Sequence, residues 1–192
     1  MNKDDAVGTA LTWPQVWLAA VARPTVSTHQ ELAKQPRVGS WDGWIWLAGS
    51  SFLSGLLVSV GPILAHARPA SDLGLPLAAF VILAVFAWVI FIVCVQQTAR
   101  LLRGEGTHPA LVYSFAAFSA PLMLLASGLS LVPHSRPGLV LLYLYWLILY
   151  SVAVQAAHRL SWVKAVGSVL LSLILLSGVL LGFGFVTVAW KL

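Results

Sequence analysis

Five long apolar segments constrain the fold of this chain more than any other feature of its sequence. None of them contains Asp, Glu, Lys or Arg. A helix needs about 20 mostly apolar residues to cross a membrane, and segments of this kind meet that need. The segments cover residues 44–65, 77–95, 109–131, 138–157 and 165–190. The sequence therefore predicts an all-α integral membrane protein whose core is a bundle of five transmembrane helices.

Charge and cysteine content narrow the function classes. Charged residues make up 9% of the chain, against about 25% in a soluble domain. The excess of 11 Lys and Arg over 6 Asp and Glu would favour nucleic-acid binding in a soluble protein. Here the basic residues lie at the ends of apolar segments, where they orient a membrane protein, so no nucleic-acid partner is expected. The single cysteine, Cys94, allows neither an intrachain disulfide nor a cysteine-based metal site.

The Lys and Arg residues outside the predicted spans are distributed unequally between the two sides. The side of the N-terminus holds eight of them, namely Lys3, Arg23, Lys34, Arg37, Arg100, Arg103, Arg159 and Lys164. The other side holds three, namely Arg68, Arg136 and Lys191. Because cytoplasmic loops carry the excess of positive charge, we expect a cytoplasmic N-terminus and an outer C-terminus. The short links also predict that consecutive helices are antiparallel neighbours.

The N-terminal segment, residues 1–43, is predicted to be cytoplasmic or interfacial and to precede a transmembrane domain of residues 44–192. One helical face of it carries Trp13, Val16, Trp17, Ala20 and Val21. That pattern favours an amphipathic helix lying in the membrane interface over a loosely ordered tail. The run "THQE", residues 28–31, fits a capping box that opens a second short helix, and Pro36 is expected to end it.

The run "LLRGEGTHPA", residues 101–110, raises the question of a phosphate-binding loop. Thr107 can cap the third span and Pro109 fits its first turn, so a helix start is present. The lysine and hydroxyl pair of a nucleotide-binding loop is missing, however, and no strand precedes the glycines. We therefore favour a hairpin turn, with lipid headgroups as an intermediate alternative. The cations that could contact such headgroups are Arg100, Arg103, Arg159 and Lys164.

Two outer turns share the pattern His-x-Arg-Pro. The first contains His66 and Arg68, and the second contains His134 and Arg136. These pairs could contact an anionic headgroup or the acidic surface of a partner. Coincidence between two short turns is the interpretation that we favour.

Small residues at helical spacing predict faces where helices pack closely in lipid. They are Ser51, Gly55 and Ser59 in the first span, and Ser168, Ser172, Gly178 and Gly182 in the fifth. Packing within the bundle is favoured over a dimer interface. Likewise Tyr143, Trp146 and Tyr150 share one helical face, for which aromatic packing is favoured over a cofactor site.

Polar residues lie near the cytoplasmic span ends, namely Gln96, Gln97, Gln155 and His158. They could form a binding site, but helix ends returning to water are favoured because no carboxylate partner is present. The spans lack the ionisable groups that ion-coupled transporters use. The five histidines are scattered and all six acids lie outside the spans. We therefore predict no catalytic residues, no metal site and no cofactor.

Three segments resemble the Yip1-domain family of small five-span membrane proteins. They are "ARPTVSTHQEL" (residues 22–32), "GEGTHPALVYSFAAFSAP" (residues 104–121) and "AAHRLSWVKA" (residues 156–165). Eukaryotic members of that family are linked to vesicle trafficking and to prenylated small GTPases. The short form of this chain resembles prokaryotic members, which implies the bacterial inner membrane. The eukaryotic members typically carry a longer cytoplasmic N-terminal domain. Only 43 residues precede the first predicted span here, so small-GTPase binding is not expected.

The resulting hypothesis is a non-enzymatic scaffold or accessory subunit that organises partner membrane proteins or lipids. The alternative is a small transporter or lipid-handling protein. In that case Pro121 would open a polar gap lined by Ser114 and Ser119.

The predicted topology can be tested with reporter fusions. Fusions after Ser71 and after Leu192 should both report the outer side of the membrane, because the excess of Lys and Arg lies on the opposite side. A cytoplasmic signal from either fusion would contradict the five-span topology.

Overall fold

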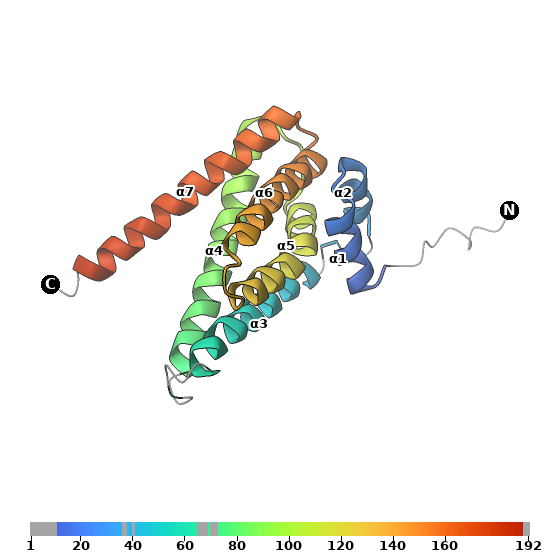
Figure 1. Cartoon of the computed structure of the whole chain (residues 1–192). Helices are drawn as coiled ribbons and strands as arrows, with labels where there is room; N and C mark the ends of the chain where they lie inside the picture. Colours follow the sequence, from blue (N-terminus) through green and yellow to red (C-terminus); the bar gives the residue numbers. More distant parts are fainter. Residues whose placement is uncertain (1–10, 36–37, 40, 65–68, 70–72, 190–192) are drawn as a thin grey trace.

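The computed structural model describes residues 11–35, 38–39, 41–64, 69 and 73–189. These residues form seven helices (Figure 1). Two short ones come first, α1 (Trp13–Ala22) and α2 (Val26–Leu32). The long helices are α3 (Asp42–Leu64), α4 (Gly74–Leu101), α5 (His108–Ser130), α6 (Arg136–His158) and α7 (Trp162–Ala189). All five long helices are apolar and long enough to cross a membrane, which confirms the predicted fold class.

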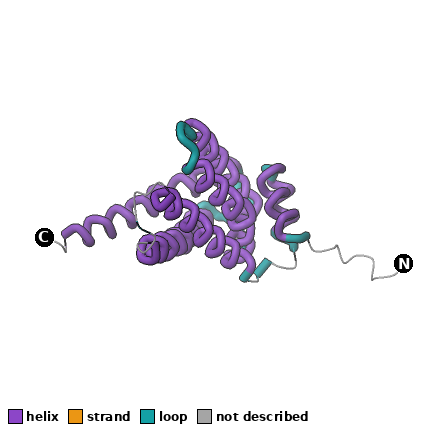
Figure 2. The backbone as a smooth tube through the Cα atoms, turned by 60° about the horizontal axis from the view of Figure 1, so that its bottom comes forward, coloured by secondary structure: helices purple, strands orange, loops and turns teal. Residues whose placement is uncertain are grey.

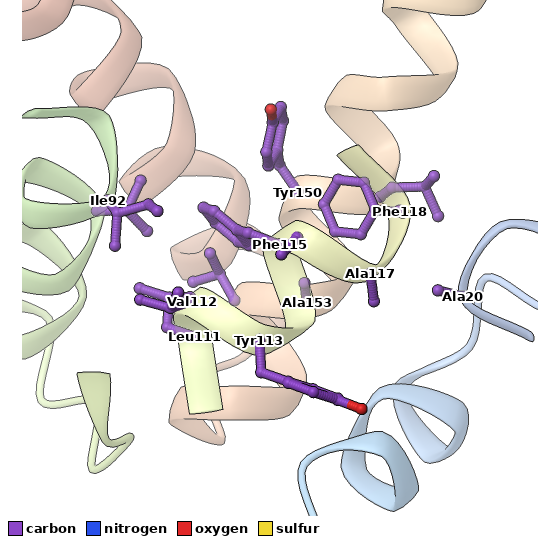
Figure 3. Close-up of a cluster of buried hydrophobic side chains, with 14 of the residues drawn as sticks. Ala20, Ile92, Leu111, Val112, Tyr113, Phe115, Ala117, Phe118, Tyr150 and Ala153 are labelled. Atoms are coloured by element: carbon purple, nitrogen blue, oxygen red, sulfur yellow. The ribbon is translucent and has the colours of Figure 1, made fainter. Parts of the chain in front are cut away.

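Helix α5 lies at the centre of the bundle. Ten consecutive residues of this helix, from Leu111 to Ala120, are buried, so all of its faces are covered by protein along this stretch. Many of these side chains are small, such as Ala116 and Ala117, so neighbouring helices can approach its backbone closely. Phe115 and Phe118 fill the space that remains and contact Tyr150 of α6, with ring centroids 4.9 and 5.1 Å apart (Figure 3).

The neighbours of α5 are α1, α3 and α6. The contact with α3 is close at Gly43, where an added Cβ would lie 3.0 Å from the Cγ1 atom of Val112. The expectation that all consecutive helices pack together is wrong for α4 and α5, which make few contacts. Helix α4 packs between α3 and α7 instead, and the loop of residues 102–107 carries the chain across to α5.

Three buried hydroxyl groups join α4 to α7. Oγ1 of Thr98 lies 2.7 Å from Oγ of Ser168 and 3.0 Å from Oγ of Ser172. Leu173 and Leu176 still pack against the core, and α7 then diverges from the other helices, as two views show (Figures 1 and 2). Ile174, on the outer side of the packed part, is 67% exposed, and Leu181, in the diverging part, is 74% exposed. One end of α7 is therefore held by the bundle and the other extends free of it.

The helices α1 and α2 pack onto the bundle, α1 against α5 and α2 against α6. Val16 and Ala20 of the predicted apolar face are fully buried in this contact. The hydroxyl group of Tyr145 donates to the carbonyl oxygen of Val21. The N-terminal helices thus cover protein surface in addition to any contact with lipid.

The predicted start of the second short helix is wrong by a few residues. Helix α2 begins at Val26, and its cap is Thr25, whose hydroxyl oxygen accepts from the N–H of Thr28 at 3.2 Å. Thr25 caps the helix in place of Thr28 because its extended backbone lets its side chain reach the N–H of the first turn. The helix ends at Leu32, and Pro36 lies outside the described residues.

His29 is the least expected residue of α2. Its imidazole is fully buried and packs edge-on against Phe118, with ring centroids 5.8 Å apart. Neither ring nitrogen has a hydrogen-bond partner within the described part of the chain. Burial lowers the pKa of His29 from 6.5 to about 4, because a charged imidazole would lose its hydration there. Helix α2 therefore docks with a neutral histidine.

This burial predicts that α1 and α2 undock at acid pH. The free histidine takes up a proton below pH 6.5, whereas the docked one does so only near pH 4. Docking is therefore at full strength above pH 6.5 and loses up to about 3 kcal/mol as the pH falls to 4. Hydrogen-exchange protection factors of residues 13–32 should decrease across this range.

The variant His29→Leu should remove that pH dependence, because leucine fills the site without titrating. His134→Asn is the matched control, since His134 is exposed and asparagine tolerates its positive φ of 63°. Equal pH dependence in wild type and His29→Leu would show that another group controls docking.

Candidate functional site

The loop of residues 102–107 is held tightly between the ends of α4 and α6. The N–H of Gly106 donates to Nδ1 of His158 at 3.1 Å, and Nε2 of Gln96 donates to the carbonyl oxygen of Gly106 at 3.1 Å. The N–H of Glu105 donates to the carbonyl oxygen of His158 at 3.2 Å. One side chain from each helix thus fixes the same residue of the loop.

The glycines of this loop are needed for space. A Cβ atom on Gly106 would lie 2.4 Å from the carbonyl oxygen of Ala157 and 2.7 Å from Nδ1 of His158. One on Gly104 would lie 2.9 Å from the carbonyl oxygen of Ala99. The two glycines therefore allow the loop to pass against backbone atoms of α4 and α6.

This arrangement corrects the interpretation of the polar span ends. Gln96 and His158 do not return to water, because both are buried and bind the loop. Gln97 is exposed and Gln155 is half-buried. Thr107 does occupy the N-cap of α5 with Pro109 in the first turn, but its side chain makes no capping hydrogen bond.

A pocket of about 590 Å³ opens beside the loop. We call it the loop-end pocket. Its walls come from the end of α2, the loop, the start of α5 and the end of α6. The polar residues that line it are Gln30, Lys34, Glu105, Thr107 and Arg159. Two cationic groups and one carboxylate thus meet around one cavity.

The four cations predicted to contact lipid headgroups lie at this same end of the bundle, and all are exposed. Only Arg159 is among the residues that line the loop-end pocket. Lys164 donates from Nζ to the carbonyl oxygen of Leu102 at 3.4 Å. Arg103 and Arg159 both have left-handed backbone conformations, with φ of 70° and 54°. Arg100 lies in the last turn of α4.

The outer anion contacts are seen only in part. His134 and Arg136 are exposed where α5 connects to α6. His66 and Arg68 lie outside the described residues. The structure therefore does not place the two His-x-Arg-Pro turns relative to each other.

The small-residue faces fall into two groups. Ser51 and Gly55 are buried in α3, and a Cβ on Gly55 would lie 2.8 Å from Cδ1 of Phe80 in α4. Ser59 is half-buried. Gly178 and Gly182 are exposed, and within the part of the chain that the structure describes nothing lies within 4 Å of a Cβ built on either. Packing of these two glycines inside the bundle, which we expected, is therefore not found, because α7 diverges there.

An aromatic cluster lies midway along α4, α5 and α6. Trp146 stacks on Tyr143 and on Tyr150, with interplanar angles of 10° and 13°. Nε1 of Trp146 donates to Oγ of Ser119 at 3.1 Å, and that hydroxyl group donates to Oη of Tyr150 at 3.3 Å. The predicted aromatic face therefore forms packing contacts, and two of its residues also hydrogen-bond the buried hydroxyl group of Ser119.

Sequence reasoning missed three residues of the loop-end pocket. The sequence marks Lys34 only as a positive charge, and nothing in it indicates that Gln30 or Glu105 lines a pocket. Gln30 and Lys34 are far from Glu105 in the sequence, and they line the same pocket because α2 packs against α6. The pattern "GEG" did mark the loop, but no local signal connects it with α2.

The tight fit of the loop gives a test in Gly106→Ala. The added methyl group would collide with backbone of Ala157, so the loop must shift and lose its bonds to Gln96 and His158. We expect a loss of about 1–3 kcal/mol in stability, seen as a lower melting temperature in detergent. The matched control is Gly167→Ala, which places a methyl group in open space on α7 and should not destabilise the protein. Equal melting temperatures for the two variants would contradict this account.

The sequence was compared with known protein families, curated proteins and solved structures. The sequence matches the Yip1 domain over residues 18–184, which is most of the chain. No curated protein and no solved structure matches it. The match includes the loop, its partners on α4 and α6, the whole of α3 to α6, and α7 as far as residue 184. The chain therefore belongs to the Yip1-domain family and is an integral membrane protein.

Proposed function

We propose that this Yip1-domain protein is a non-enzymatic scaffold or accessory subunit that organises other membrane proteins. The observation that carries the proposal is the difference in burial between the central helix α5 and the peripheral helices α4 and α7. Helix α5 is buried over ten consecutive residues, Leu111 to Ala120. In α4 and α7, by contrast, only 22% of the residues in the most apolar stretch of each helix are buried. Side chains on these flanks are available to lipid or to other transmembrane helices.

The packing around α5 supports this role over transport. Ser114 and Ser119 are buried, and Ser119 is bonded to Trp146 and Tyr150 within the protein. Pro121 is half-buried and is followed by the buried Leu122. A transport path at Pro121 would need water or a polar substrate between these residues, whose place is taken by protein.

The free end of α7 is the surface that we assign to partner helices. Gly178 and Gly182 are spaced by four and exposed. Such spacing allows a second helix to approach the backbone closely in lipid. A trafficking-type role would follow from such assembly. We further propose a cytoplasmic N-terminus in a bacterial inner membrane, on the charge distribution and the short form of the chain.

Photo-crosslinking in native membranes tests the proposal. The change Ile174→p-benzoylphenylalanine puts the reactive group on the exposed side of α7, and the same change at Val169, which is fully buried, is the control. We expect a protein adduct of defined mass from position 174 only. The variant Gly178→Leu with Gly182→Leu should abolish it, because the larger side chains hold the partner helix away.

The control for that double variant is Gly167→Leu, which is equally open but lies near the start of α7. It should leave the adduct intact. Adducts with lipid alone, in wild-type α7, would contradict a scaffold role for this surface.

A further inference from the structure

The loop-end pocket holds charges of both signs that come from separate parts of the chain. Lys34 follows α2, Glu105 belongs to the loop between α4 and α5, and Arg159 follows α6. All three are exposed, so solvent or a ligand can reach them. Gln30 and Thr107 add uncharged polar groups to the same walls. The fold therefore gathers two cations and one anion around a single cavity.

The position of the pocket places it at the level of lipid headgroups. Helices α4 and α6 end beside it and α5 begins there, so the apolar spans stop at this depth. Trp41, just before α3, and Trp162, at the start of α7, are both exposed at the same end of the bundle. Indole rings are enriched where the membrane meets water. At this depth of the membrane, phospholipid headgroups are the most abundant ligands available to the pocket.

The charge pattern selects among headgroups. Arg and Lys bind phosphate oxygens through charge-assisted hydrogen bonds. The start of α5 borders the pocket at Thr107 and Ala110, and it favours negative charge because the helix dipole places partial positive charge there and Thr107 makes no side-chain capping hydrogen bond. A carboxylate beside these groups would repel a purely anionic headgroup. It would bind a primary ammonium group that hangs from the phosphate, whereas a quaternary ammonium has no N–H to donate.

We propose that the loop-end pocket binds the phosphoethanolamine headgroup of a membrane phospholipid. Lys34 and Arg159 hold the phosphate, and Glu105 accepts hydrogen bonds from the ammonium group. The volume of about 590 Å³ lies within the range of ligand sites and admits the headgroup together with its glycerol. A lipid bound there would join α2 to the loop and to α6, whether or not α7 binds a partner.

Native mass spectrometry of the full chain, with equal amounts of phosphatidylethanolamine, phosphatidylglycerol and phosphatidylcholine, tests the proposal. Wild type should retain phosphatidylethanolamine in preference to the other two lipids. Lys34→Gln and Arg159→Asn should each reduce binding of all three by about twofold to fivefold, as expected for exposed charge pairs. Asparagine is chosen at 159 because it tolerates the left-handed backbone.

The variant Glu105→Gln separates the ammonium contact from the phosphate contacts of the site. It should lower phosphatidylethanolamine binding by about twofold to fivefold without lowering phosphatidylglycerol binding, because only the ammonium contact is lost. Its side chain is exposed, so the fold should be unaffected. If Arg159→Asn does not fold, as judged by melting temperature, Lys34→Gln and Glu105→Gln still decide the question.

Arg103→Asn is the comparison variant, since Arg103 has the same charge and the same left-handed backbone but does not line the pocket. It should change lipid binding less than Arg159→Asn does. Equal losses in the two variants, or no lipid preference in wild type, would overturn the proposal. Soluble glycerophosphoethanolamine at the same concentration should not displace the bound lipid, and displacement would refute a membrane lipid as the ligand.

Discussion

The enclosure of α5 is the constraint on which the rest of this structure depends. Helices α1, α3 and α6 all pack against it, and α2 is held beside it through the contact of His29 with Phe118. Small side chains along α5 allow this, because lipid gives apolar helices no hydrophobic reason to associate and close packing must supply one. The hydroxyl group of Ser119 is hydrogen-bonded to Trp146 and Tyr150, so this buried polar group in the middle of α5 has its partners within the protein.

The same constraint explains which parts of the fold could be predicted. The five spans follow from apolar length, since backbone groups in lipid must be bonded within a helix. The partners of each helix do not follow, because side chains facing lipid and side chains facing protein are equally apolar. Nothing in the sequence of α4 indicates that it avoids α5 and joins α7 through Thr98, Ser168 and Ser172.

The loop-end pocket is only partly predictable from the sequence. The glycines of the loop and its flanking arginines were visible as a turn at the membrane surface. The roles of Gln96 and His158 were not, because a polar residue at a span end usually meets water, and only the fold reveals that a loop lies over it. Lys34 and Glu105 are 71 positions apart (105 − 34 = 71), so no local pattern could bring them together.

The divergence of α7 gives the molecule a lever. Its attachment through Ser168 and Ser172 lies near one end, and the helix continues for about 25 Å beyond them at 1.5 Å per residue. A tilt of roughly 10° about this attachment would displace the far end by about 4 Å, given the same rise per residue. The attachment lies at the end of the bundle that also carries the loop of residues 102–107, to which Lys164 of α7 is hydrogen-bonded through Leu102. By geometry alone, a change in packing beside that loop would shift the far end of α7 further than it shifts the attachment.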